Sequence, residues 1–213
     1  MQGYDVASSH MSIVRRVKQV QKVFELLEKE MSVFQQKSGL GCLKGCGHCC
    51  TKPDISAAVL EFLPYAFDLF LQKRSSIVKE QLQNNPQSIC HIFKASGVGE
   101  LGNTKGGCTQ YHNRGLICRL FGFATVRDKV GNPELSTCKW IKRTQSEEIE
   151  QSKNLIAEGV APSFMFYYQE LMQIDFRMGQ EYLPINEAII KAIDEVENYY
   201  QYRPFPYSFR KSA

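Results

Sequence analysis

Four cysteines fall within nine residues of this 213-residue chain, in the arrangement Cys42-x3-Cys46-x2-Cys49-Cys50. Glycines lie beside or between them at positions 41, 45 and 47. Thiolates bind soft or borderline metal ions, and glycine allows a short loop to aim several of them at one centre. The alternative is four buried thiols that pack as small hydrophobic side chains. The density of cysteine and glycine favours a metal site over that alternative.

The adjacent pair Cys49 and Cys50 is an awkward pair of ligands for a single ion. We expect one of the two to serve the first centre, while the other serves a second centre, bridges, or stays free. The Cys42-x3-Cys46-x2-Cys49 spacing also matches the spacing that holds a [4Fe-4S] cluster in radical SAM enzymes. Those enzymes use a barrel of alternating strands and helices, and this chain offers too few strands for it. The spacing therefore indicates iron–sulfur chemistry more than that enzyme class.

More thiols follow downstream, where Cys108 and Cys118 flank a turn and Cys138 follows a predicted hairpin. Such distant thiols reach the loop only in the folded chain, as in a split metal site. The predicted metal ligands are therefore Cys42, Cys46, Cys49, Cys50, Cys108, Cys118 and Cys138. Cys90 stands alone in an apolar stretch and is open to two interpretations, a buried free thiol or a further ligand. His48 lies inside the cluster, and whether it adds a nitrogen ligand is also open.

The composition indicates the class of protein and its cellular compartment. Hydrophobic residues make up 43% and charged residues 23% of the chain, as in globular proteins. The net charge of +4 forms no dense basic block, so nucleic acid is not indicated as a partner. The best apolar run, residues 57–71, is interrupted by charged residues and proline, and no secretory signal is visible, so we expect no membrane span and a cytoplasmic location. In that reducing compartment, clustered thiols indicate metal or redox chemistry.

An N-terminal helix is predicted from a Ser12 cap to about Gln36, ended by Gly39 and Gly41. Its apolar side chains are spaced alternately four and three residues apart, which is a heptad pattern. The stripe consists of Ile13, Val17, Val20, Phe24, Leu27, Met31 and Phe34. We expect this helix to dock on the domain, and a dimerising coiled coil that gives self-association is the alternative.

The remaining pattern predicts a mainly α fold, a helical domain with a small β-hairpin beside the cysteine-rich metal-binding loop. A helix is expected from Asp54 or Ser56, kinked at Pro64, and a loop is expected over residues 97–107. The hairpin is expected from strands at 116–127 and 134–140, joined by a turn at 128–133. Further helices are expected at 75–84, 146–158, 162–178 and 185–200, and the tail from Arg203 is expected to be unstructured. We divide the chain into an N-terminal helix (1–38), a cysteine-cluster metal-binding domain (39–143) and C-terminal helices packed on the same domain (144–213).

These motifs resemble the YkgJ-type cysteine-cluster family, described as a zinc- or iron-chelating domain with the signature CxxxCxxCC. The family's second pattern of Cys, Tyr, Arg-Pro and Cys-Arg corresponds to Cys108, Tyr111, Arg114-Gly115 and Cys118-Arg119. Gly115 departs from the usual proline. The resemblance covers the chain from Cys42 to about Cys138 and implies metal chelation, with zinc or iron as the cofactor and an iron–sulfur cluster as one form of it.

Arg114 and Arg119 are the predicted cofactor-binding residues. They would neutralise the negative charge of thiolates around a metal ion, or hold an anionic substrate. Three functional classes stay open. The first is a metal-binding protein whose ion is structural or carried. The second is an iron–sulfur enzyme such as a protein-lysine methyltransferase, or an electron-transfer protein. The third is a zinc-dependent interaction module for protein or nucleic acid.

Overall fold

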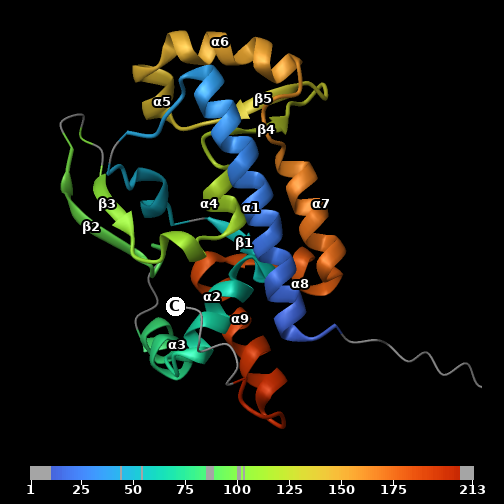
Figure 1. Cartoon of the computed structure of the whole chain (residues 1–213). Coiled ribbons are helices and arrows are strands. Elements are labelled where there is room, and N and C mark those ends of the chain that lie inside the picture. The colour runs from blue at the N-terminus through green and yellow to red at the C-terminus, as the bar shows by residue number, and fades with distance from the viewer. Residues whose placement is uncertain are drawn as a thin grey trace, which may run out of the picture.

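The longest element, α1 (Ile13–Ser38), runs along the middle of the molecule (Figure 1). Our computed structural model describes residues 11–206, apart from residues 44, 54, 85–88, 100, 101 and 103. The Ser12 side chain accepts a hydrogen bond from the Arg15 amide at 3.3 Å, which caps the start of α1. Gly39 ends the helix with a left-handed φ of 75°. Both ends agree with the sequence prediction.

The heptad stripe of α1 is buried within the chain itself. Its seven side chains are between 0% and 7% exposed. They pack towards α2 (Leu63–Leu71), α6 (Ser146–Ala157) and α7 (Phe164–Ile174), which all contact α1. The stripe is therefore part of the core, and this helix offers no support for self-association through a coiled coil.

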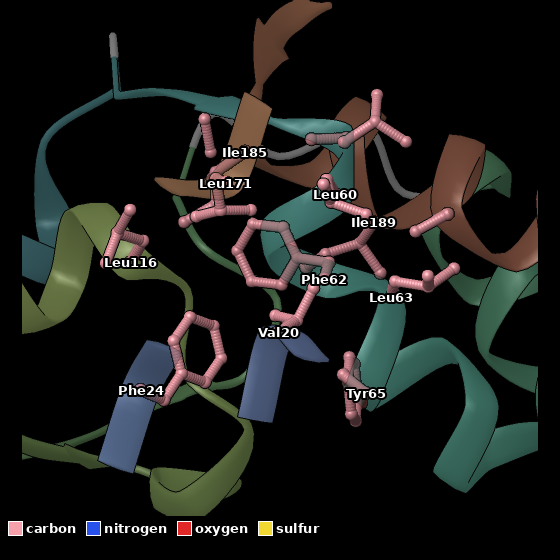
Figure 2. Packing of buried hydrophobic residues seen from close by; sticks show 14 of the residues in the cluster. Val20, Phe24, Leu60, Phe62, Leu63, Tyr65, Leu116, Leu171, Ile185 and Ile189 are labelled. Atoms are coloured by element: carbon pink, nitrogen blue, oxygen red, sulfur yellow. The ribbon is translucent and has the colours of Figure 1, made fainter. Parts of the chain in front are cut away.

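One hydrophobic core joins distant parts of the chain (Figure 2). Val20 of α1 lies next to Phe62, Phe24 and Leu63 lie on either side of this pair, and Leu171 of α7 lies on the side of Phe62 away from Val20. Helix α9 (Ile185–Tyr200) adds one face, with Ile185 and Ile189 completely or nearly buried. The C-terminal helices thus share a core with α1.

Short elements surround this core. The helices are α3 (Ser75–Asn84), α4 (Leu116–Leu120), α5 (Lys139–Thr144) and α8 (Phe176–Gln180), and the 3₁₀ helices are η1 (His48–Thr51), η2 (Val59–Phe62) and η3 (Tyr111–Asn113). Three antiparallel pairs join β1 (Ser56–Ala58) to β6 (Tyr182–Pro184), β2 (Phe93–Val98) to β3 (Thr104–Cys108), and β4 (Ala124–Arg127) to β5 (Pro133–Ser136). The mainly α fold with small hairpins is confirmed. Among the described residues, no helix has the length and apolar character needed to cross a membrane.

The glycine-rich segment 97–107 is not the loop that its composition predicts. It forms the end of β2, a short connection, and most of β3, with Lys94 opposite Gly107 and Ala95 opposite Gly106. Backbone pairing requires no side chain, and the glycines allow other groups to approach the ribbon closely. The prediction failed because glycine was interpreted only as a sign of turns.

Residues 116–127 were expected to form one strand, but the first part is helix α4 and only the second part is β4. Similarly, 134–140 divides into the end of β5 and the start of α5. The hairpin itself is present, and its turn is fixed by the Asp128 carboxylate, which accepts from the Val130 and Asn132 amides at 2.9 and 2.8 Å. The sheet is shorter than predicted because apolar residues of short helices and strands look alike in sequence.

The segment before Pro64 also differs from the prediction of one kinked helix. It forms β1 and then η2, and Pro64 lies in the first turn of α2, where its missing amide hydrogen has no cost. Asp54, one of the two expected start points, lies outside the described residues. Of the expected unstructured tail, Phe205 stacks on Phe70 with ring centroids 5.2 Å apart, and residues 207–213 are outside the described part.

Candidate metal centre

The cysteine loop is attached to the outer edge of β3. The Gly47 amide donates to the Thr104 carbonyl at 2.8 Å, and the Gly106 amide donates to the Gly45 carbonyl at 2.9 Å. Cys46 forms an isolated antiparallel bridge with Lys105. The loop therefore behaves as a third strand on the β2–β3 ribbon, and this fixes the positions of Cys46 and Cys49 relative to Cys108. Figure 1 shows this ribbon and η1 on one side of α1, opposite α7.

Two glycines make this close approach possible. A Cβ atom at Gly47 would lie 2.2 Å from a ring carbon of Phe93, and one at Gly106 would lie 2.5 Å from the same ring and from the Lys94 carbonyl oxygen. Neither position has room for a side chain. The Phe93 ring thus packs directly on the backbones of both strands and holds the cysteine loop against the hairpin.

The first cysteine of the motif is tied to the α5–α6 junction. The Gly41 amide donates to Gln145 Oε1 at 2.8 Å, and Gln145 Nε2 donates back to the Gly41 carbonyl at 2.6 Å. Cys138 is the N-cap residue of α5, whose first helical bond joins the Lys142 amide to the Cys138 carbonyl. Gln145, the residue that ends α5, therefore ties the backbone next to Cys42 to the helix that Cys138 caps at its other end.

Cys118 lies on α4, and the start of this helix is held by the buried carboxylate of Glu61. Glu61 is 0% exposed, and its two oxygens accept from the Ala58 amide (2.8 Å), the Ile117 amide (2.8 Å) and the Tyr168 hydroxyl (3.0 Å). Burial, opposed by these hydrogen bonds, raises the pKa of Glu61 to about 7. A Cβ atom at Gly115 would lie 2.9 Å from both Glu61 Oε2 and a ring carbon of Phe62, so a side chain at this position would require these groups to move.

Cys90 lies in the turn before β2, not in the helical setting expected from its apolar neighbours. The Phe93 amide donates to the Cys90 carbonyl at 3.0 Å, and Asn186 of α9 holds the flanking residues through the His91 amide and the Ile89 carbonyl. Because Phe93 is the register partner of Cys108, Cys90 and Cys108 are at the same end of the ribbon. Cys90 is 7% exposed.

A first group of thiols influences Cys42. Burial is the largest cause that raises the pKa of Cys42 to about 11, and the charges of Cys46, Cys49 and Cys138 and a hydrogen bond with the Cys46 side chain contribute to the same shift. Cys42 is also an exposed residue. This group lies at the surface, between the cysteine loop and α5.

A second group lies deeper. Burial raises the pKa of Cys118, to which the charges of Cys90, Cys49 and Cys108 add. Burial also raises the pKa of Cys90 to about 11, and Cys108 and Cys49 contribute. A hydrogen bond with the Cys49 side chain is the largest cause of the raised pKa of Cys50, and burial, Cys49, Cys118 and Cys90 follow. Cys90, Cys118, Cys49 and Cys50 therefore influence one another electrostatically, and the assignment of the seven predicted cysteines as metal ligands stays a prediction.

Cys49 stands between the two groups and differs from the other cysteines. Its pKa is lowered to about 6, first by the hydrogen bond from Cys50, then by backbone amides and the charge of Arg114, against the opposing effect of burial. The Arg114 guanidinium lies 4.0 Å from the centre of the Tyr111 ring. Burial raises the pKa of Cys108, and the charge of Arg114 is among the effects that oppose this rise. The charge of Arg114 thus acts on both Cys49 and Cys108, and its role in neutralising a thiolate site stays a prediction.

Arg119 has a different position. Its guanidinium is 3% exposed, pairs with Glu28 of α1, and donates to the Arg114 carbonyl at 3.1 Å and the His112 carbonyl at 2.6 Å. It also packs 4.3 Å from the centre of the Phe24 ring. These contacts attach the turn between Cys108 and Cys118 to α1 and occupy the donors that a cofactor would need.

His48 lies beside the first group, edge-on to Trp140 with ring centroids 5.9 Å apart. Burial and the charges of Lys139 and Lys52 lower the pKa of His48, which favours the neutral imidazole that metals bind. The Trp140 indole Nε1 is buried without a hydrogen-bond partner among the described residues. No contact assigns His48 to the thiols, so its role as a ligand stays open.

The donor set suits a thiophilic metal, although the thiols are not already arranged around one. Among the described residues, no three His, Cys, Asp or Glu side chains are placed as the ligands of a metal ion. The chemistry of eight neighbouring cysteines nevertheless fits zinc or iron. The buried Nε of Arg114 also has no hydrogen-bond partner in the described part of the chain, which fits an anionic thiolate group beside it.

Two positioning residues were not predicted from the sequence. Glu61 is the single carboxylate in the apolar run Val59–Leu63. An acid in such a run indicates a buried carboxylate that is held by hydrogen bonds. Gln145 gave no signal, because an amide at a helix start has no distinctive pattern. Its partner, Gly41, is 104 positions away in the chain.

Comparison with known proteins adds no evidence about the function of this chain. No family model, no curated protein and no solved structure matches this chain. The resemblance to the YkgJ-type family therefore rests on the spacing of its motifs.

Proposed function

We propose that this protein chelates zinc or iron through clustered cysteine thiolates. The observation that carries the proposal is that the loop with four cysteines is hydrogen-bonded to β3, the strand that ends at Cys108, while Gln145 ties the start of this loop to the helix that Cys138 caps. Clustered thiols without a bound metal would repel one another once ionised and would be open to oxidation. A metal ion removes both difficulties.

The supporting contacts serve this arrangement specifically. Gln145 fixes the backbone beside Cys42, Glu61 fixes the start of the helix that carries Cys118, and Phe93 seals the loop against β3. Arg114 supplies a positive charge and a free donor at the thiols. Ligands held in this way by groups outside the coordination shell are typical of metal sites.

Elemental analysis of protein purified without air or chelators tests the proposal. We expect zinc or iron in stoichiometric amounts, with a brown colour if iron is bound by thiolates and no colour if zinc is bound. The matched control is the Cys46→Ser/Cys118→Ser double variant, purified in parallel, which should retain far less metal. Wild-type protein that contains neither metal under these conditions would refute the proposal.

A second candidate function has one observation in its favour. Segments 39–53, 89–119 and 137–145, which carry every cysteine, contain nine of the 26 Lys and Arg residues but only one of the 22 Asp and Glu residues. Six of these cations are exposed, namely Lys52, Lys94, Lys105, Lys139, Lys142 and Arg143. None of the six forms an ion pair with an acidic side chain within the described residues. A cationic surface beside the thiols favours a zinc-dependent interaction module over an electron-transfer protein.

Binding of a polyanion at low and high salt tests this second function. An interaction module should bind heparin-like or nucleic-acid polyanions in a salt-dependent way, and Lys139→Glu/Arg143→Glu should abolish binding while metal content stays unchanged. Lys153→Glu, at an exposed position on α6, is the control. If Lys139→Glu/Arg143→Glu and Lys153→Glu bind the polyanion equally well, the cationic surface is not the binding site.

A further inference from the structure

A cavity of about 470 Å³ lies between α3, the turn before β2, and the start of α9. Its volume is in the range of cavities that hold small organic molecules. The buried side chains of Leu82 and Cys90 line it, and so do the exposed side chains of Glu80 and Gln81. The cavity therefore reaches from the surface of the molecule to the edge of its core.

Hydrogen bonds of Asn186, on α9, hold one wall of this cavity. The Oδ1 atom of Asn186 accepts from the His91 amide at 2.8 Å, and its Nδ2 atom donates to the Ile89 carbonyl at 2.8 Å. The Phe93 amide donates to the Cys90 carbonyl at 3.0 Å, which closes the turn. This wall is thus fixed before any ligand binds, and such preorganisation lowers the entropic cost of binding.

Glu80 gives the cavity a negative charge. Among the described residues that line the cavity, Glu80 is the one carboxylate, and there is no lysine or arginine. Glu80 forms no ion pair within the described part of the chain, and its neighbour Lys79 is paired instead with Asp194 and Glu197 of α9. The charge of the cavity therefore favours a cationic ligand over an anionic one.

The other lining groups suit an aliphatic ammonium compound. Burial lowers the pKa of His91, so its imidazole is uncharged near neutral pH and can accept a hydrogen bond. The side-chain oxygens of Gln81 and Asn84 can accept hydrogen bonds from N–H groups as well. The face of the Phe93 ring attracts a cation, and Leu82 offers an apolar contact to a carbon chain.

We propose that this cavity binds a small organic cation, an aliphatic amine whose ammonium group pairs with Glu80 and whose carbon chain lies along Leu82 and Phe93. This inference goes beyond metal chelation and does not depend on it. A lone metal ion is a poorer occupant, because the cavity is far larger than an ion and one carboxylate supplies too few oxygen ligands.

Phe93 connects this cavity to the cysteine loop. The far end of its ring is the group that a Cβ atom at Gly47 or Gly106 would meet, at 2.2 and 2.5 Å. The Cys90 thiol also lines the cavity, whereas Cys42 is an exposed residue of the loop. An amine bound against Phe93 should therefore shield Cys90 and leave Cys42 unaffected.

Calorimetric titration of the full-length protein with putrescine and spermidine tests the proposal, and butanediol, which has the same carbon chain as putrescine, tests the role of charge. We expect both amines to bind, more weakly as salt is added, and the diol not to bind. Glu80→Gln should weaken amine binding about tenfold, because it removes a hydrogen bond between charged groups. Glu187→Gln, at an exposed position of α9, is the matched control with the same change of charge and should bind as the wild type does.

A second measurement locates the bound amine. Alkylation of the cysteines, mapped by mass spectrometry, should slow at Cys90 when spermidine is present and continue unchanged at Cys42. The absence of amine binding, equal binding of the diol, or equal losses in Glu80→Gln and Glu187→Gln would overturn the proposal. Equal effects of spermidine on Cys42 and Cys90 would also overturn it, because the amine would then not lie in the cavity.

Discussion

Gln145 and Gly41 hold each other through a reciprocal pair of hydrogen bonds, with the Gly41 amide 2.8 Å from Oε1 and its carbonyl oxygen 2.6 Å from Nε2. This pair closes the gap between the end of α1 and the start of α6, and Cys42 follows immediately. The surface thiols therefore depend on one amide side chain that is not itself a ligand.

Gln145→Ala should lower the free energy of unfolding by about 1–3 kcal/mol, because both hydrogen bonds are lost and the Gly41 groups are partly buried. It should also speed the removal of metal from Cys42 by a chelator. Urea unfolding and chelator kinetics measure the two effects. Gln151→Ala, on an exposed position of α6, is the matched control, and equal behaviour of the two variants would contradict the positioning role of Gln145.

The neighbouring glycines Gly106 and Gly107 of β3 test whether the Phe93 ring holds the cysteine loop against this strand. Gly106→Ala should destabilise the protein by about 1–3 kcal/mol, because its Cβ would lie 2.5 Å from the Phe93 ring and from the Lys94 carbonyl. Gly107→Ala should be nearly neutral, since no atom lies within 4 Å of its Cβ position. Thermal unfolding of both variants compares them. Equal losses of stability would mean that Phe93 does not pack on this strand.

Glu61 should make stability depend on pH. Its pKa is raised from 4.5 to about 7 in the folded state, so the folded protein retains a proton that the unfolded chain releases. The stabilisation is complete below pH 4.5 and is lost as the pH rises through about 7, an effect of roughly 3 kcal/mol. Unfolding free energies of metal-free protein from pH 5 to 8 measure it.

Glu61→Gln should abolish this slope. It should also reduce stability at pH 5 by about 1–3 kcal/mol, because the partners of Glu61 are donors and an amide NH₂ group cannot accept from them. A variant that retains the wild-type slope would show that another group titrates.

The stripe of α1 should behave as core. Leu27→Ala should cost about 2–5 kcal/mol, since Leu27 is 0% exposed, whereas Leu26→Ala, at 55% exposure, should change stability little. Urea unfolding at two protein concentrations separates this packing from a coiled coil. A midpoint that rises with concentration would indicate that the stripe is an intermolecular contact.

The sequence was informative where a local pattern determines the structure. The Ser12 cap, the stripe of α1 and the left-handed Gly39 fixed the first helix, and the periodicity of residues 185–200 predicted α9 with its observed bounds. The cysteine spacing identified the loop. Each of these features is encoded within a few consecutive turns of the chain.

The rest depended on contacts between distant residues. The glycines of the β2–β3 ribbon are explained by the Phe93 ring and by the cysteine loop, which lies about sixty positions before the residues of β3 that it contacts. The sequence around Cys90 contains no other cysteine, and the thiol of Cys108 influences it only in the folded chain. The position of Arg119 next to Cys118 predicts cofactor binding, but its guanidinium pairs with Glu28 and donates to two backbone carbonyls that are brought to it by folding.

X-ray absorption at the metal edge of anaerobically purified protein tests the central claim most directly, because it reports the atoms bound to the metal. The account predicts a shell made mainly of sulfur atoms, at about 2.3 Å as in zinc thiolate sites. Cys46→Ser/Cys118→Ser should lose this shell. A shell made of oxygen or nitrogen atoms in the wild type would contradict the account, because the metal would then be bound elsewhere than at the cysteines.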